Sequence, residues 1–335
     1  MNNKLIAVSI GDIKGIGIHL LIKIFLNKKL KNFVLFSNKN IFNKHLKEQN
    51  IKIKINVINN KKNKLIYNKN YLNIYDYKVK NKNENTIMSI RYAHQEYFKN
   101  NFIGLVTLPL RKDLIKNHIN KNFVGHTEYL QNMEKAKYSN MILYHNKIMV
   151  SPLTTHIKIE SVSKIISKKN FIYNQVVNLN NILIKDFNIL KPKIIISGLN
   201  PHSGENGTIG KEEIKTIIPQ IKKIKKRGIN IFGPSSADSM LTNLKDKNYD
   251  CYVFLYHDQA LIPFKYISNF SGVNYTGNLK IIRTSPDHGT AYDLINSKNA
   301  STKSLLNSFK LIKVIYRNRI KYAKTKKIIK SKFFN

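Results

Sequence analysis

Short apolar runs alternate with segments of helical spacing along the chain. The runs that predict buried strands are Leu5–Ile10, Phe33–Ser37, Phe102–Leu108, Ile148–Leu153, Ile194–Ile196 and Tyr252–Tyr256. Most of them are β-branched or aromatic and are bounded by glycine, proline or small polar residues, as expected of buried strands. Strands that alternate with helices are typical of an α/β fold built on mostly parallel sheets.

Apolar residues at intervals of three and four predict the helices between these strands. The predicted helices are Ile18–Lys29, Thr86–Phe98, 158–168, 173–190, Lys211–Lys226 with Pro219 interrupting it, and Lys303–Tyr322 with a frayed tail after it. Residues 50–85 are rich in Lys, Asn and Tyr, and their short alternating pieces predict edge strands and loops.

A histidine follows three of the apolar runs. His156, His202 and His257 each stand after a strand and a turn of small or polar residues. Ligands of open α/β sheets bind outside the carboxyl ends of the strands, so these imidazoles are candidates for one site. Three imidazoles suit zinc or another transition metal with positions left open for substrate. No CxxC or HExxH pattern accompanies them, and three unrelated loop histidines fit the spacing as well.

A second set of residues could hold an anion. His126 and Thr127 begin a helical segment, where unpaired backbone N–H groups attract phosphate or carboxylate. Plain N-capping by Thr127 is an equal alternative. Lys265, Asn274 and Arg283 could add basic and amide groups to such a pocket, although each alone also fits a surface position.

The first strand leads into a glycine turn. Gly11, Gly15 and Gly17 precede the predicted helix, whose N-terminus could face an anion or simply follow a tight turn. The spacing does not fit G-x-G-x-x-G, so the Rossmann fingerprint of dinucleotide-binding proteins is absent.

The net charge of +39 looks at first like a nucleic-acid signal. Only six of the 58 basic residues are Arg, the residue that suits bidentate contacts to bases and phosphates. Scattered Lys with abundant Asn and Ile and no Trp indicates compositional drift, so we expect no specific nucleic-acid partner. Non-specific binding of RNA or DNA at low salt is still expected from this charge, and a basic nucleic-acid-binding protein without catalysis is the alternative of another class. No apolar run is long enough to cross a membrane. Cys251 is the only cysteine and is expected to be a buried thiol in a reducing cytoplasm.

A series of motifs occurs in one order along the chain: SIGDIKGIGIHLL, TLPLRK, GHTEYL, SPLTTH, SGLNPHSGENGTIGKEEI, GPSSAD, YHDQALIPFKY, GVNYT and RTSPDHGTAYD. Together they resemble the 4-hydroxythreonine-4-phosphate dehydrogenase family over about residues 5–310. LNPHSGE, YHDQ and RTSPDHGTA are the most specific of them.

The resemblance implies an isocitrate/isopropylmalate dehydrogenase-like fold of two α/β/α lobes. Residues 1–125 with about 290–335 would form the lobe on the cofactor side, and about 126–289 the lobe with the metal, the substrate and the dimer interface. It also implies a homodimer with its active site at that interface.

The resemblance assigns roles to individual residues. It implies that His156, His202 and His257 bind one divalent metal, which could be zinc, magnesium or cobalt. The implied substrate-binding residues are His126, Thr127, Lys265, Asn274 and Arg283. Asp287, His288, Gly289, Thr290 and Ala291 would hold NAD, with NADP also possible, and Lys265 or Asp238 would be the catalytic base.

The activity implied by this family is NAD-dependent, metal-assisted oxidation and decarboxylation of 4-phosphooxy-L-threonine. The product would be 3-amino-2-oxopropyl phosphate, a precursor of pyridoxine 5'-phosphate in vitamin B6 biosynthesis. A related dehydrogenase acting on threonate or erythronate 4-phosphate is the nearest alternative, and a metal-dependent phosphohydrolase is a more distant one.

Overall fold

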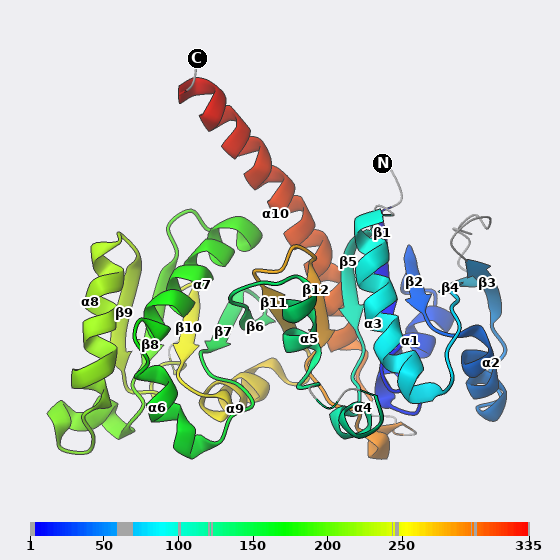
Figure 1. Ribbon diagram of the computed structural model, residues 1–335, viewed down its shortest axis with the longest axis horizontal. Coiled ribbons are helices and arrows are strands. Elements are labelled where there is room, and N and C mark those ends of the chain that lie inside the picture. The colour runs from blue at the N-terminus through cyan, green and yellow to red at the C-terminus, as the bar shows by residue number, and fades with distance from the viewer. Residues whose placement is uncertain are drawn as a thin grey trace. The chain divides into compact units, whose positions relative to one another are not determined.

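The computed structural model divides into two compact units (Figure 1). It describes residues 4–58, 70–99, 102–119, 121, 123–242, 244, 248–295, 297 and 300–333, with the side chains of 118 and 327–333 excepted. Unit 1 comprises residues 1–134 and 280–313, and unit 2 comprises residues 135–279 and 314–335. The predicted lobes divided at 125 and about 290, and placed the whole C-terminal helix in the first lobe.

Unit 1 is built on a sheet whose strands lie in the order β3-β4-β2-β1-β5-β12. These strands are β1 (Leu5–Ser9), β2 (Phe33–Phe36), β3 (Lys54–Ile58), β4 (Tyr71–Tyr75), β5 (Phe102–Thr107) and β12 (Arg283–Pro286), and their pairings are parallel. The helices of this unit are α1 (Ile16–Leu26), α2 (Lys39–Glu48), α3 (Lys82–Lys99), α4 (Lys112–His118), α5 (His126–Met133) and the start of α10 (Lys303–Phe333). β1 is buried at every position, as its apolar run predicts.

Unit 2 has strands in the order β11-β6-β7-β10-β8-β9. These are β6 (Asn140–His145), β7 (Ile148–Pro152), β8 (Lys193–Ser197), β9 (Asn230–Ser235), β10 (Cys251–Phe254) and β11 (Val273–Gly277). β6 runs antiparallel to β7 and β11, whereas β7, β10, β8 and β9 pair in parallel. The helices are α6 (Val162–Ile166), α7 (Phe171–Phe187), α8 (Ile218–Lys226) and α9 (His257–Ser268).

The α/β class and all six predicted strands are confirmed. The helix interrupted by Pro219 is a π-helical turn, Glu213–Ile217, followed by α8, which takes this proline in its first turn, where a missing N–H is tolerated. The tail predicted to fray instead continues α10 to Phe333. Residues 50–85 were predicted to form edge strands, and β3 is one, whereas β4 lies inside the sheet between β3 and β2. Residues 59–69 lie outside the described residues. No described helix has the length and apolarity needed to cross a membrane.

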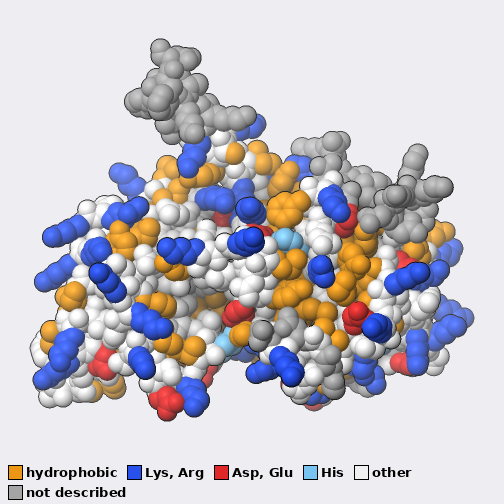
Figure 2. All heavy atoms as spheres, viewed as in Figure 1, with side chains coloured by type: hydrophobic (Ala, Val, Ile, Leu, Met, Phe, Trp, Pro, Cys, Tyr) orange, Lys and Arg blue, Asp and Glu red, His pale blue; other side chains and the backbone are white. Residues whose placement is uncertain are grey.

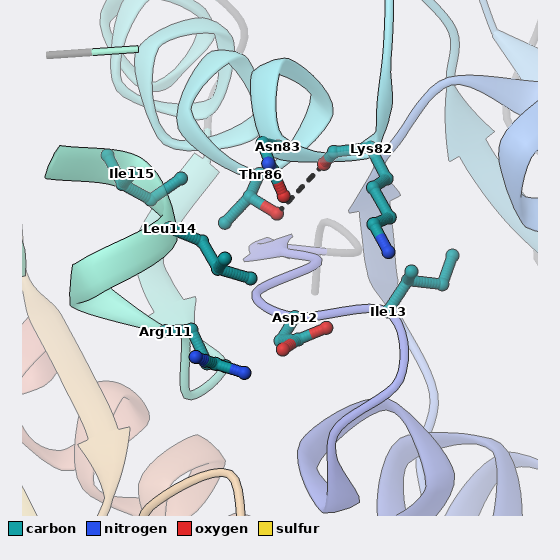
Figure 3. Close-up of a pocket in the computed structure, with 8 residues that line it drawn as sticks. All are labelled: Asp12, Ile13, Lys82, Asn83, Thr86, Arg111, Leu114 and Ile115. Carbon is teal, nitrogen blue, oxygen red and sulfur yellow. Dashed lines mark hydrogen bonds between the residues drawn. The ribbon is translucent and has the colours of Figure 1, made fainter. Parts of the chain in front are cut away.

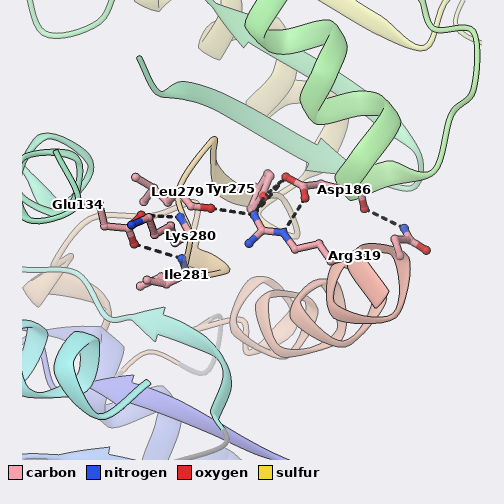
Figure 4. A network of polar contacts seen from close by, with 8 residues as sticks. Glu134, Asp186, Tyr275, Leu279, Lys280, Ile281 and Arg319 are labelled. Carbon is pink, nitrogen blue, oxygen red and sulfur yellow. Dashed lines mark hydrogen bonds and ion pairs between the residues drawn. The ribbon is translucent and has the colours of Figure 1, made fainter. Parts of the chain in front are cut away.

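A buried carboxylate joins three elements of unit 2 (Figure 4). Arg319 of α10 donates from Nε to Asp186 Oδ1 at 2.7 Å, and the Tyr275 hydroxyl donates to Asp186 Oδ2 at 2.5 Å. Asp186 and Tyr275 are buried, and Arg319 is nearly so. A buried ion pair is held together by its mutual hydrogen bonds, because either charge left alone would be poorly solvated. The network fixes α10 against α7 and β11.

A carboxylate also organises unit 1. Glu134 accepts hydrogen bonds from the backbone N–H groups of Lys280 and Ile281 (Figure 4). His94 Nε2 lies 3.3 Å from Glu134 Oε1. His94 is buried, and its ring packs edge-on against Phe98.

Arg319→Met is expected to lower the free energy of unfolding by about 3 kcal/mol, because it leaves the Asp186 charge buried without its cation. Urea unfolding measures the loss. The matched control is Lys321→Met on the exposed side of the same helix, expected to change stability by less than about 0.5 kcal/mol. Equal stabilities for the two variants would contradict the role given to the ion pair.

Candidate functional site

The three histidine-bearing loops of unit 2 follow three neighbouring parallel strands. β10 pairs with β7 on one side and with β8 on the other. His156 follows β7, His257 follows β10 and His202 follows β8, so the three loops leave the same edge of the sheet. The side-by-side placement expected of these strand ends is confirmed.

Hydrogen bonds from two side chains hold these strand ends together. Thr154 is buried and donates from its hydroxyl to the Leu255 carbonyl at 2.8 Å, which joins the ends of β7 and β10. Gln259 Oε1 accepts from the Leu255 N–H and from the Ser197 hydroxyl, both at 3.0 Å. Its Nε2 donates to the Gly198 carbonyl at 3.0 Å. Gln259 therefore joins the ends of β10 and β8.

His156 and His257 lie together at the edge of a cavity. Their ring centroids are 5.8 Å apart, and both residues line a cavity of about 270 Å³ with Thr154, Thr155, Tyr256 and Asp258. Asp258 Oδ1 lies 2.6 Å from His257 Nδ1. A carboxylate on one imidazole nitrogen leaves the other as the natural metal ligand, an arrangement common around metal-binding histidines.

His202 lies in a loop with an uncommon backbone. Residues 202–207 all have positive φ, including 50° at His202, and His156 also has a φ of 50°. Left-handed conformations are unfavourable for residues with a β-carbon and persist where the surroundings hold them, often at functional sites. Glu213 supplies that support, because its buried carboxylate accepts from the backbone N–H groups of Leu199 and Asn200 at 2.8 and 2.9 Å.

The donor set of the three loops suits a transition metal. Imidazole nitrogen is a good ligand for zinc or cobalt, whereas magnesium prefers oxygen. In the part of the chain that the structure describes, no three His, Cys, Asp or Glu side chains lie close enough together to hold an ion. Two of the histidines are adjacent and the third stands on the next strand, so the three-histidine site stays a prediction.

Unit 1 brings together three of the predicted substrate-binding residues. Arg283 is 3% exposed and donates from Nε and Nη2 to the Thr107 hydroxyl at 3.0 and 2.6 Å. Its Nη1 lies 3.4 Å from the Thr127 hydroxyl. His126 is the first residue of α5 and Gly125 is its N-cap, without a side-chain capping bond. Thr127 is therefore not the cap, and the anion pocket stays a prediction.

Burial and charge set the protonation of this cluster. Burial lowers the pKa of His126 well below its usual value, and the charges of Arg283 and Lys112 lower it further. The pKa of Arg283 falls to about 10 through burial, with Glu128 opposing the shift. At neutral pH the cluster has a charged guanidinium beside a neutral imidazole. Among the described residues, no hydrogen-bond partner lies on the buried Nε2 of His126.

The remaining predicted substrate and catalytic residues belong to unit 2. Lys265 lies on α9 and is exposed, as is Asp238 in the turn after β9. Asn274 of β11 has a buried side-chain oxygen that has no hydrogen-bond partner in the described part of the chain. The roles of Lys265, Asp238 and Asn274 stay predictions.

The predicted cofactor segment Asp287–Ala291 packs on the first glycine turn. The Thr290 carbonyl accepts the Ile16 N–H at 2.8 Å, and the Tyr292 hydroxyl donates to Asp12. Because the Thr290 carbonyl already accepts the first N–H of α1, the segment Gly11–Gly17 fits a tight turn better than an open anion site. Figure 3 shows the neighbouring pocket, where Lys82 and Arg111 stand near Asp12.

The comparisons with known proteins agree on one family. A family model described as "Pyridoxal phosphate biosynthetic protein PdxA" matches residues 29–312. A 4-hydroxythreonine-4-phosphate dehydrogenase of Sulfurihydrogenibium sp. (strain YO3AOP1) is 34% identical over 323 residues, which is 94% of this chain and 99% of the relative. The chain belongs to the PdxA family.

Solved structures support the same relationship. The crystal structure of a 4-hydroxythreonine-4-phosphate dehydrogenase from Klebsiella pneumoniae matches with a TM-score of 0.80 at 27% identity, covering 93% of this chain and 98% of that one. A D-threonate 4-phosphate dehydrogenase of Pectobacterium atrosepticum is 34% identical over 210 residues, 62% of this chain and 63% of the relative. The family resemblance inferred from the motifs is confirmed.

Sequence reasoning missed several residues that position the site in this PdxA-family chain. Gln259, Asp258 and Glu213 stand inside the motifs YHDQ and GKEE, but no spacing rule gave them a role. Thr107 ends a strand, where a hydroxyl is unremarkable by itself. The only available signal was their location just after buried strands, beside the candidate ligands.

The pKa of His126 predicts a specific pH dependence of stability. Because the folded-state pKa lies below the unfolded value near 6.5, the unfolded chain takes up a proton first as the pH falls. The stability that depends on neutral His126 is present above pH 6.5 and is lost below it. Between pH 7 and 5.5, wild type should lose about 1 kcal/mol more than His126→Gln.

Urea unfolding of both proteins across this range measures the difference. The other histidines are common to both proteins and therefore cancel. A constant difference between the two across the range would contradict the lowered pKa.

Proposed function

We propose that the protein is an NAD-dependent dehydrogenase that oxidises and decarboxylates 4-phosphooxy-L-threonine in vitamin B6 biosynthesis. The observation that carries the proposal is the full-length match to a 4-hydroxythreonine-4-phosphate dehydrogenase, 94% of this chain against 99% of the relative. The reaction removes the C3 hydroxyl proton and transfers hydride from C3 to NAD⁺. The resulting β-keto acid releases CO₂ and takes up a proton at C2, giving 3-amino-2-oxopropyl phosphate.

His156, His202 and His257 are the residues proposed to hold one divalent metal. When bound, such an ion supplies Lewis acidity that lowers the pKa of a coordinated hydroxyl and steadies negative charge on oxygen. The imidazole donors favour zinc or cobalt over magnesium. Asp258 orients His257 through Nδ1, and Gln259 fixes the loops from which His257 and His202 extend.

The protein's own groups perform binding and proton transfer in this scheme. The neutral His126, the Thr127 hydroxyl and the charged Arg283 bind the anionic part of the substrate. Lys265 or Asp238 accepts the hydroxyl proton, directly or through water. Asn274 offers a buried amide oxygen to a donor on the substrate. Asp287–Ala291 is the segment proposed to hold NAD, with NADP as a second possibility.

A homodimer is proposed from the surface of unit 2. Ile262 and Tyr266 of α9 and Phe270 just after its end are 70%, 88% and 68% exposed and stand four residues apart. Ile262 and Tyr266 lie one turn apart on α9, and Phe270 follows the left-handed C-cap Asn269. Exposed large apolar side chains that lie close together in this way are typical of a surface that another protein covers. Lys265 lies on this helix, so a second subunit seated there would border the site, as the family resemblance implies.

The proposal also includes that the enzyme is soluble and cytoplasmic and has no specific nucleic-acid partner. Lys and Arg side chains are spread over the face drawn in Figure 2 and do not gather into one patch. The single cysteine, Cys251, is buried and free, as expected in a reducing compartment.

Threonate or erythronate 4-phosphate is the alternative substrate. The named D-threonate 4-phosphate dehydrogenase is as similar as the other relatives over the matched region, although that region is 62% of this chain. These substrates have no amino group. Formation of NADH from each substrate at equal concentration decides between the two activities.

Purified protein should reduce NAD⁺ with 4-phosphooxy-L-threonine, and a chelator should abolish the reaction until zinc or cobalt is restored. His202→Ala is expected to lose at least about 100-fold in kcat and most of the bound metal, since it removes a ligand. His145→Ala, which changes a histidine at the end of β6, is the matched control. Full turnover and unchanged metal content in His202→Ala would contradict the proposed role of the metal.

Tyr266→Glu should convert a dimer into a monomer of 38.9 kDa, because a charge would be buried at the proposed interface. Analytical ultracentrifugation measures the mass. Leu190→Glu, which changes a residue that is 81% exposed elsewhere on unit 2, should leave the mass unchanged. An unaltered dimer in Tyr266→Glu would show that α9 is not the interface.

A further inference from the structure

Lys112 lies beside the predicted anion-binding residues of unit 1, Arg283, His126 and Thr127. It is the first residue of α4, and a short connection separates it from Thr107, the residue on which Arg283 rests. A β-carbon added to Gly125, the N-cap of α5, would lie 3.6 Å from Lys112 Nζ. The ammonium group therefore lies over the bare backbone at the start of α5, one residue from His126.

The glycine at position 125 makes this approach possible. Its φ of 175° is ordinary extended backbone, so conformation does not require glycine there. The same added β-carbon would come within 2.9 Å of Glu128 Oε2. A side chain at this position would fill the space in which the Lys112 ammonium and the Glu128 carboxylate face the N-terminus of the helix.

Electrostatic coupling ties Lys112 to the cluster. Burial lowers the pKa of Lys112 and the charge of Glu128 raises it, while the charge of Lys112 helps to lower the pKa of His126. The charge of Glu128 also raises the pKa of Arg283. One carboxylate thus balances two cations, so the pocket retains about one positive charge for an incoming anion. Solvent reaches part of the Lys112 side chain, which leaves its tip accessible to a ligand.

We propose that Lys112 is a further substrate-binding residue, whose ammonium group binds an anionic oxygen group of the substrate together with His126 and Arg283. The assignment rests on the proposed function, since a phosphorylated hydroxy acid supplies that oxygen group. The Nε2 of His126 is the buried polar atom that this ligand would meet. Phosphate and carboxylate share the required chemistry, because each offers several charged acceptor oxygens.

Lys112→Gln tests the assignment, and the matched control is Lys116→Gln, which changes an exposed lysine one turn later on the same short helix. With 4-phosphooxy-L-threonine, KM should rise about 10-fold or more in Lys112→Gln while kcat changes little, since a charge-assisted hydrogen bond to the bound substrate is lost. Lys112→Arg should restore much of the affinity. Lys116→Gln should match wild type.

A second readout does not depend on catalysis. Thermal unfolding is followed with inorganic phosphate and, separately, with L-threonine, which has the carboxylate and no phosphate. A ligand that raises the Tm of wild type and Lys116→Gln but not of Lys112→Gln identifies the group that Lys112 binds.

The two readouts separate the possible failures. Absence of NADH formation in wild type overturns the proposed function, while the thermal shifts still decide whether Lys112 binds an anion. Equal shifts and equal KM values in Lys112→Gln and wild type, or no stabilisation of wild type by either ligand, would overturn the assignment. If Lys112→Gln unfolds at a markedly lower temperature without ligand, Lys112→Met takes its place in the same comparison.

Discussion

The candidate site depends on the register of three parallel strands. β7, β10 and β8 are neighbours, so the loops that follow them must start from one edge of the sheet. The Gln259 amide and the Thr154 hydroxyl fix these loop starts, because each bonds to the backbone of a neighbouring strand end. Residues about fifty positions apart along the chain become neighbours by this means. The fold therefore brings the three histidine-bearing loops to one edge of the sheet without a short local motif.

The anion pocket of unit 1 follows the same rule with different chemistry. Thr107 ends β5 and holds the guanidinium of Arg283, which begins β12 on the adjacent strand. Burial makes that guanidinium costly to leave unpaired, so hydroxyl partners and a nearby carboxylate keep it in place. The same burial keeps His126 neutral. A positive group beside a neutral imidazole suits a phosphorylated substrate.

Much of the fold could be predicted from the sequence because its buried strands are uninterrupted apolar runs. Ile194–Ile196 is one example, and its neighbour Tyr252–Tyr256 is another. β6 was missed because Asn140 and His145 give it polar ends, and α2 because its apolar residues are few. Motifs identified the family, and the strand ends placed the histidines on one edge. The roles of Gln259, Glu213 and Lys112 could not be predicted, since each acts through contacts with residues distant in the sequence.

The central claim is that His156, His202 and His257 bind one metal ion at the ends of β7, β8 and β10. A crystal of the protein grown with Co²⁺, with diffraction recorded on both sides of the cobalt absorption edge, tests it directly. We expect one strong anomalous peak about 2.1 Å from a nitrogen of each of the three imidazoles, the distance typical of imidazole ligands. Cobalt bound elsewhere, or bound with His202 turned away from it, would contradict the account.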